Sequence, residues 1–292
     1  MIDRPQYWQQ IMPFVDKPFI KVFIGERRAG KSTMLLLIQQ QLLEQGIKEE
    51  QIISINFESM AYYDLRNSRA LYAHVLDRVK KIEGKAYLFF DEIQVVDRWE
   101  EAINSFLIDF PSDLYITGSN SHLLSSELST VLTGRYIHIK MQPLSFLEML
   151  SFRGEHATED LLWLYIRRGG FPAVHLADYD ERTSYAIISS IYDSIVLRDV
   201  VQRYNIRHID VLNRVMQFIM DTVGRTISAK KTADYFKSQY RSVDINTIYT
   251  YLDALESAFV ISKVQRYDIQ GKELLLGSVE PLPPLVGRFV ST

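Results

Sequence analysis

Short apolar runs alternate with helical stretches along the first half of the chain. The apolar runs predict strands at 21–24, 52–57, 86–90, 114–117 and 136–140. The stretches between them predict helices at 32–46, 68–82 and 98–110. Several of the strands are apolar throughout, which is typical of a parallel sheet that is covered on both faces. We therefore predict an α/β core built on a five-stranded parallel sheet.

The pattern changes after Pro143, where helical stretches replace the alternation. These helices are interrupted at 169–172, and the later part ends in an alternating pair at 260–267 and 273–276. Short helices followed by such a pair suit a small winged helix-turn-helix. We predict four parts, namely a core at 1–144, a helical lid segment at 145–205, a winged-helix domain at 206–276 and an irregular tail at 277–292.

Residues 25–32 match the pattern G-x-x-x-x-G-K-[ST] between a predicted strand and a predicted helix. The glycines let backbone N–H groups curl around phosphate oxygens, and the following helix adds its positive end. The lysine would reach the β- and γ-phosphates, while the serine hydroxyl would ligate Mg²⁺. The alternative is a plain glycine turn that opens a helix. The motif predicts a P-loop NTPase core that binds ATP and Mg²⁺ through Gly25, Arg28, Ala29, Gly30, Lys31, Ser32 and Thr33.

An apolar strand ends in the acidic pair Asp91 and Glu92. In a nucleotide site, a carboxylate in this place holds Mg²⁺, largely through water, so we assign Asp91 to the metal. We expect Glu92 to orient and deprotonate the attacking water. The alternative is that the acidic residues only cap the helix that follows.

Polar residues also follow the strand predicted at 114–117. A side chain at the end of a strand beside the P-loop can hydrogen-bond the γ-phosphate or the attacking water. Asn120 is the first candidate for this sensor role, and Ser119 is the second. A serine and asparagine turn would have the same composition and remains the alternative.

Three of these segments, ERRAGKST, DEIQ and TGSNS, resemble a group of prokaryotic AAA-type ATPases known as archaeal ATPase-like proteins. The resemblance covers roughly residues 4–276 and is carried by 26–33, 91–94, 117–121, 132–135, 143–148, 169–172 and 197–200. It implies an ATPase core, a helical segment and a winged helix. Family members usually continue into a C-terminal domain of unknown function. We do not find the start of that domain after Leu276, so we expect the domain to be truncated here. In the family this domain is thought to resemble restriction endonucleases, and we therefore do not extend a nuclease activity to this chain.

Arg135 precedes the last predicted strand of the sheet. By analogy with AAA-type enzymes, this arginine would contact the γ-phosphate of a neighbouring subunit and stabilise charge in the transition state. That role requires a homo-oligomer. The alternative is an ordinary surface or salt-bridged arginine.

Composition and charge narrow the classes of partner. The chain has 292 residues, a formal net charge of −3 and no cysteine, which excludes disulfides, thiolate zinc sites and cysteine nucleophiles. No uncharged apolar run approaches the roughly 18 residues that cross a bilayer, and the N-terminus lacks the pattern of a signal peptide. We therefore expect a cytoplasmic protein with no membrane partner.

DNA is a candidate partner of the predicted winged helix. Residues 205–272 contain 10 Lys and Arg against 7 Asp and Glu, a local charge of +3. Asp244 can cap the second helix of the pair predicted at 228–240 and 244–258. Its N-terminal end would then expose Asn246, Thr247, Tyr249 and Thr250. The alternative is a winged helix that serves only in packing or protein contacts.

These observations favour an Mg²⁺-dependent AAA-type ATPase in which ATP binding and hydrolysis move the helical and winged-helix parts. Two alternatives remain open. One is a DNA-binding regulator that ATP switches with little turnover. The other is a nucleotide-binding fragment of a larger protein.

Overall fold

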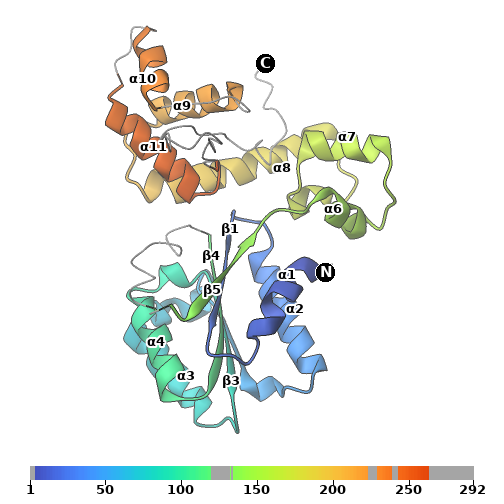
Figure 1. The fold of residues 1–292 in the computed structure, drawn as a ribbon, viewed down its shortest axis with the longest axis vertical. Coiled ribbons are helices and arrows are strands. Elements are labelled where there is room, and N and C mark those ends of the chain that lie inside the picture. The colour runs from blue at the N-terminus through green and yellow to red at the C-terminus, as the bar shows by residue number, and fades with distance from the viewer. Residues whose placement is uncertain (1–3, 120–131, 133, 223–228, 239–242, 263–292) are drawn as a thin grey trace, which may run out of the picture. The chain divides into compact units, whose positions relative to one another are not determined.

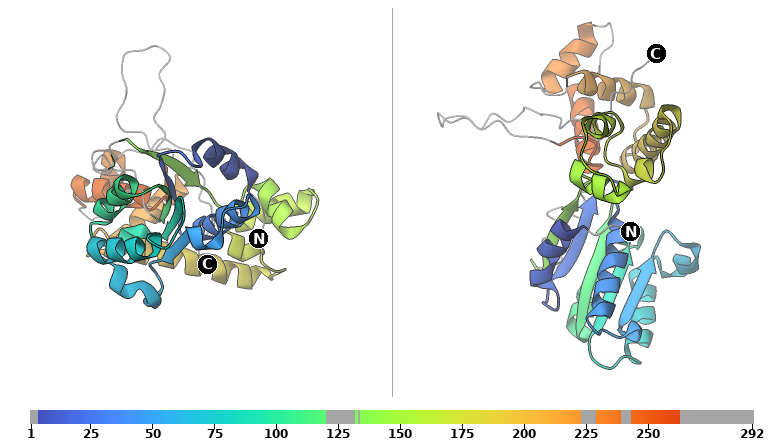
Figure 2. Two further views of the ribbon diagram at one scale, coloured as in Figure 1. Left: turned by 90° about the horizontal axis from the view of Figure 1, so that it is seen from below. Right: turned by 90° about the vertical axis from the view of Figure 1, so that its right-hand side faces the viewer.

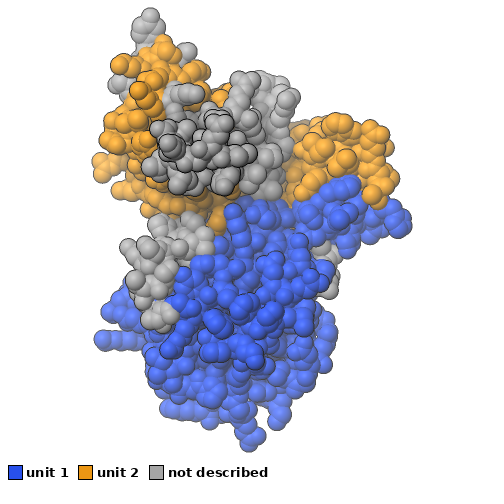
Figure 3. Space-filling view, in the orientation of Figure 1, with its two compact units in different colours: residues 1–156 blue, residues 157–292 orange. Residues whose placement is uncertain are grey.

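The computed structural model describes residues 4–119, 132, 134–222, 229–238 and 243–262. The chain divides into two compact units, Met1–His156 and Ala157–Thr292 (Figure 3). Each unit has its own hydrophobic core. The predicted four-part division is finer than these two units, and its bounds stay a prediction.

A five-stranded sheet forms the centre of the first unit, and its strands lie side by side in Figure 2 (right). Its strands are β1 (Ile20–Gly25), β2 (Ile52–Asn56), β3 (Ala86–Asp91), β4 (Ser112–Gly118) and β5 (Tyr136–Met141). The spatial order is β2-β3-β4-β1-β5, and every neighbouring pair is parallel. This confirms the predicted five-stranded parallel sheet. Because all strands are parallel, their carboxyl ends lie at one edge.

Helices cover both faces of this sheet. In Figure 1, α1 and α2 lie on one face and α3 and α4 on the other. The α-helices are α1 (Pro5–Ile11), α2 (Lys31–Glu44), α3 (Ser68–Val79), α4 (Trp99–Asp109) and α6 (Phe146–Arg153). Short 3-10 helices are η1 (Met12–Phe14), η2 (Glu49–Gln51), η3 (Met60–Leu65) and η4 (Ile93–Val95). Helix α3 ends at Val79, three residues before its predicted end at 82. The N–H groups of residues 80–82 bond to carbonyls of the last turn of the helix, so these residues form a closing turn.

Aromatic side chains fill the space on both faces of the sheet. On the face of α1 and α2, Phe89 stacks on Tyr115 with ring centroids 4.6 Å apart. On the other face, Phe106 of α4 packs 5.7 Å from Phe90 and 5.8 Å from Tyr72. All residues of β1 and β3 are buried, which explains why both strands are apolar almost throughout.

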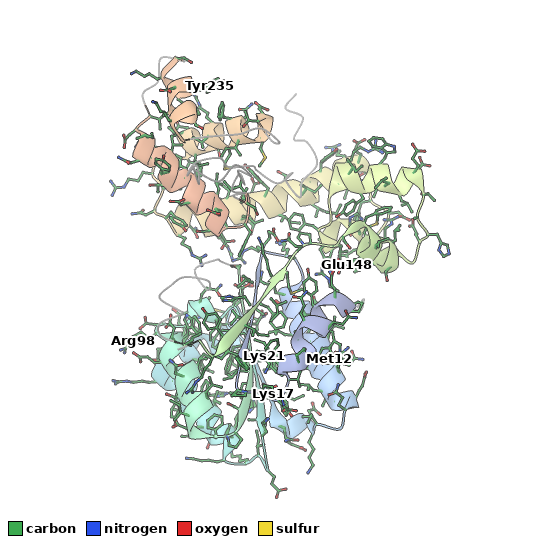
Figure 4. The ribbon with its side chains drawn as sticks, viewed as in Figure 1. Met12, Lys17, Lys21, Arg98, Glu148 and Tyr235 are labelled. Atoms are coloured by element: carbon green, nitrogen blue, oxygen red, sulfur yellow. The ribbon has the colours of Figure 1, made fainter. Side chains whose placement is uncertain are left out.

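One charged pair is buried within this apolar sheet. The ammonium of Lys21 on β1 (labelled in Figure 4) forms an ion pair with Asp113 on β4, and both side chains are fully buried. Asp113 also accepts hydrogen bonds from the Tyr115 hydroxyl at 2.8 Å and the Asp16 N–H at 3.1 Å. Burial lowers the pKa of Lys21, while Asp113 acts in the opposite direction. The pair therefore depends on both of its charges.

The second unit is helical in the described residues. Its α-helices are α7 (Glu159–Arg168), α8 (Glu181–Ser194), α9 (Ile209–Asp221), α10 (Ala229–Ser238) and α11 (Ile245–Ser257). A 3-10 turn, η6 (Pro172–His175), follows the predicted break, and the π-helix η7 (Ile195–Gln202) continues α8. Buried residues such as Ile188, Val215 and Leu252 form its core. Among the described helices, none is both long enough and apolar enough to cross a membrane.

The predicted winged helix is described only in its helical part. Helices α10 and α11 fall within the predicted pair. Asn246, Tyr249 and Thr250 are exposed on α11 as predicted, whereas Thr247 is half-buried. Asp244 occupies the N-cap position, but among the described residues its side chain makes no capping hydrogen bond. The first-turn N–H of Thr247 bonds the backbone carbonyl of Asp244 instead. Most of the predicted wing and the tail at 277–292 lie outside the described residues, so the winged helix stays a prediction.

Breaking the buried ion pair should destabilise the first unit. We expect Asp113→Asn to lower the free energy of unfolding by about 3–5 kcal/mol, because it leaves the Lys21 charge buried without a counter-charge. Asp77→Asn is the control, since Asp77 and Lys81 form an exposed pair; its urea midpoint should stay close to that of the wild type. Equal midpoints for all three proteins would show that the buried pair contributes nothing.

Candidate nucleotide-binding site

The carboxyl edge of the sheet brings together residues that lie far apart in the sequence. Strand β4 lies between β1 and β3, with Phe23 opposite Thr117 on one side and Phe90 opposite Ile116 on the other. Asp91 at the end of β3 also lies opposite Asn56 at the end of β2. The loop of residues 25–30 leaves β1 at this same edge and leads into α2.

Gly25 begins the loop where no larger residue fits. Its φ is +144°, and a Cβ built there would lie 2.1 Å from the carbonyl oxygen of Met141 on β5. A side chain would collide with a backbone atom that the sheet holds in place. The first glycine of the motif is therefore required by the close approach of two strands.

The rest of the loop has an uncommon backbone conformation. Arg28 and Gly30 have left-handed backbones, with φ of 65° and 98°. Within the described residues, no side chain caps the first turn of α2, so its N–H groups are left for a bound anion or water. Ser32 and Thr33 are exposed in this turn, and Arg28 is exposed in the loop.

Lys31 lies inside the loop. Its side chain is buried, and Nζ donates hydrogen bonds to the carbonyls of Gly25 at 3.0 Å and Glu26 at 2.8 Å. Burial lowers the pKa of this ammonium, while the carboxylates of Glu92, Glu26 and Asp91 raise it. The ammonium therefore lies in the field of three carboxylates.

Asp91 is fixed by two neighbouring strands. Its Oδ1 accepts a hydrogen bond of 2.5 Å from the Thr117 hydroxyl, and its Oδ2 accepts one of 3.0 Å from Asn56 Nδ2. The Thr117 hydroxyl also accepts the backbone N–H of Glu92 at 2.9 Å. Sequence analysis did not assign a role to Thr117 or Asn56. Each is a polar residue at the carboxyl end of a strand of the sheet, which is the pattern that would have indicated them.

Glu92 has an unusual backbone. Its φ and ψ are 57° and 47°, a left-handed conformation that is uncommon for a residue with a side chain. The side chain is 7% exposed and accepts a hydrogen bond from Gln94. Glu92 is the N-cap of η4, but in the described part of the chain its side chain forms no capping bond. The cap alternative therefore does not explain its position.

Glu26 is a buried carboxyl group that sequence analysis overlooked. It is 4% exposed, and its Oε2 has no hydrogen-bond partner among the described residues. Burial raises the pKa of Glu26 to about 7, against the opposing charges of Lys140 and Lys31. The Oγ of buried Ser119 and Oε1 of Gln94 also lack described partners. Buried polar atoms without partners point to a ligand or ordered water, so this edge fits a polar ligand.

Of the remaining predicted site residues, one is not described and the other lies away from this arrangement. Asn120 lies outside the described residues. Arg135 is exposed, and its carbonyl accepts the N–H of Ile20 at 2.8 Å, at the start of β1. Strand β5 then runs from Tyr136 to Met141, which lies opposite Gly25. Arg135 is thus about 20 Å from the loop along the strands, at the opposite edge of the sheet.

Glu26 should make stability fall as the pH rises. Because its folded pKa of about 7 lies above the ordinary 4.5, the folded chain keeps a proton that the unfolded chain has released between these values. Glu26→Gln has no such proton to lose. We therefore expect its free energy of unfolding, relative to that of the wild type, to rise by about 1–3 kcal/mol from pH 5 to pH 8. Urea unfolding at several pH values measures this. The exposed Glu83→Gln is the control, and parallel profiles for all three proteins would contradict the assignment.

Comparison with known proteins agrees with the motifs of the chain. The family model of an AAA domain, AAA_14, matches residues 17–150, and a domain of unknown function, DUF8612, matches residues 159–274. An uncharacterised protein of Haemophilus influenzae is 39% identical over 279 residues, 94% of this chain and 69% of that protein. The uncharacterised protein MJ1544 of Methanocaldococcus jannaschii is 32% identical over 266 residues, 87% of this chain and 58% of its own.

Solved structures resemble the chain more distantly. The Orc1 protein of Aeropyrum pernix in complex with DNA has a TM-score of 0.44 at 13% identity, covering 96% of this chain and 90% of Orc1. Cdc6p of Pyrobaculum aerophilum has a TM-score of 0.41 at 14% identity, with the same coverage of 96% and 90%. These scores are too low to support an argument about the whole chain. The two matching families and the bacterial and archaeal relatives show that the chain belongs to a family of prokaryotic proteins in which an AAA_14 P-loop domain is followed by a DUF8612 domain.

Proposed function

We propose that the protein is an Mg²⁺-dependent ATPase whose nucleotide state moves its helical and predicted winged-helix parts. The observation that carries this proposal is the Thr117 hydroxyl, which bonds both Asp91 and the backbone of Glu92 beside the loop that holds Lys31. An AAA domain makes nucleotide binding the expected activity of this edge.

The loop and the first turn of α2 would hold the phosphates of ATP. Backbone N–H groups of the loop are suited to phosphate oxygens, and Arg28 and Thr33 are exposed beside them. Lys31 now donates to two loop carbonyls, and the β- and γ-phosphates would take their place. Ser32 and Asp91 would supply the hard oxygen ligands that Mg²⁺ prefers, and the ion would neutralise phosphate charge.

Glu92 is the candidate base for hydrolysis. Its carboxylate would orient and deprotonate the attacking water. The bond from its N–H to Thr117 fixes its backbone, and Gln94 holds its side chain. Ser119, which is buried with an unpartnered hydroxyl among the described residues, supports the proposed sensor role of this strand end. Asn120 remains the first candidate for that role.

A second candidate function is an ATP-switched DNA-binding regulator with little turnover. The exposed Asn246, Tyr249 and Thr250 on α11 favour it, because polar residues of this kind reach base edges from a helix.

The relatives are longer than the region that matches this chain. The activity described here therefore belongs to the shared AAA_14 and DUF8612 part, and any partner of a longer protein is a separate question.

Substitutions at the two acidic residues should have different effects on ATP hydrolysis and ATP binding. Glu92→Gln keeps the reach of the side chain but removes its basicity, so single-turnover hydrolysis should fall by about 10²–10⁴-fold while ATP stays bound. Asp91→Asn should instead weaken Mg²⁺-dependent binding, and Lys31→Ala should abolish it. The exposed Glu83→Gln is the control. Normal hydrolysis by Glu92→Gln, or turnover near zero in wild type with and without duplex DNA, would favour the switch.

Arg135 should act on a neighbouring chain if it acts at all, because it lies at the far edge of its own sheet. We expect Arg135→Ala to lower turnover with little change in ATP affinity. Mixing Arg135→Ala with Glu92→Gln should restore activity, since the second protein lends its intact arginine to the intact glutamate of the first. Activity that is independent of protein concentration and not restored by mixing would exclude this role.

A further inference from the structure

A buried arginine just before α1 joins four segments of the first unit. Arg4 is 5% exposed, and its Nη1 donates a hydrogen bond of 3.0 Å to the carbonyl of Ala29 in the loop. Its Nη2 donates to the carbonyl of Gln142 at 2.9 Å, after the end of β5. Its Nε and Nη2 bind the carboxylate of Glu148 on α6 at 2.7 and 3.2 Å. One guanidinium therefore ties the N-terminal segment, the loop, the end of β5 and α6 together.

The contact with Ala29 reaches the part of the loop that would face a bound nucleotide. The carbonyl of Ala29 and the N–H of Gly30 belong to one peptide unit, and in a trans peptide they point in opposite directions. A bond that holds the carbonyl toward Arg4 therefore turns the N–H away from Arg4. A Cβ built on Gly30 would lie 3.7 Å from Arg4 Nη1, so the arginine lies against this side of the loop.

The carboxylate of Glu148 anchors the arginine. Burial alone would raise the pKa of Glu148, but hydrogen bonds from Arg4 and from the Ser145 N–H hold it below the ordinary value. Glu148 and Ser145 also form the capping box of α6. The carboxylate of Glu148, which is labelled in Figure 4, thus caps the start of α6 and holds the guanidinium that bonds the loop.

We propose that Arg4 is a positioning residue for the phosphate-binding loop, an inference that rests on the proposed function. By holding the Ala29 carbonyl, it keeps the Gly30 N–H in the orientation that binds a phosphate oxygen. Through Glu148, it couples this orientation to α6, so that a change in the loop on nucleotide binding is transmitted to the start of that helix. A purely structural arginine would instead stabilise the unit without any effect on nucleotide affinity.

The test compares Arg4→Lys with Gln6→Ala in the full chain. Lysine keeps the charge, but a single ammonium cannot bond Glu148, Gln142 and Ala29 in the same fork. Gln6 donates to the same Glu148 carboxylate at 2.9 Å, is exposed and, within the described part of the chain, forms no hydrogen bond to the loop. We expect Arg4→Lys to weaken Mg-ATP binding about ten-fold, by equilibrium titration, while bound ATP is hydrolysed within about two-fold of the wild-type rate. Gln6→Ala should match wild type in both measurements.

A second variant keeps the test decisive if Arg4→Lys does not fold. Glu148→Gln leaves the arginine in place with a neutral partner, and we expect a weakening of Mg-ATP binding by about three-fold or more. Wild-type affinity in a folded Arg4→Lys, or in Glu148→Gln, overturns the inference. If Lys31→Ala loses binding in the same titration, the proposed function stands and only the role of Arg4 fails. A wild-type chain that binds no Mg-ATP overturns both.

Discussion

The hydroxyl of Thr117 is the contact on which the rest of the candidate site depends. It donates to the Asp91 carboxylate and accepts the N–H of Glu92, so one side chain of β4 orients both acidic residues. This is possible only because β4 lies between β1 and β3 in one register. A slip of one residue would turn Thr117 to the opposite face of the sheet. The register of β4 between its two neighbours therefore determines the geometry of the acidic pair.

The strands, the loop and the acidic pair could be predicted because each depends on neighbouring residues. Apolar runs indicate buried strands wherever they pair, and the glycines and lysine of the loop follow one another directly. Thr117 and Asn56 could not be assigned to Asp91, because their contact depends on which strands are adjacent. The bond between Arg4 and Glu148 spans 144 positions. Nothing local in the sequence predicts that these two residues meet, or that Glu26 is buried.

The charges at this edge explain why a divalent cation belongs to the proposed chemistry. Glu26, Asp91 and Glu92 are all buried around the ammonium of Lys31. Charges removed from water are costly unless they are paired. A polyphosphate alone would add negative charge to this group, whereas a phosphate-bound Mg²⁺ would offset it. Burial likewise raises the pKa of Glu26, against the opposing charges of Lys140 and Lys31, because the carboxylate form loses its contact with water.

The backbone of Glu92 distinguishes the two candidate functions. A left-handed conformation at a residue with a side chain costs on the order of 1–3 kcal/mol and persists where the surroundings determine it. Here Thr117 holds the backbone N–H and Gln94 holds the carboxylate. A switch that only senses bound ATP needs Lys31 and Asp91, but it gives the Glu92 carboxylate no task. Hydrolysis does need a base held at a fixed place beside the phosphates. The strained and doubly held Glu92 therefore favours turnover over simple switching.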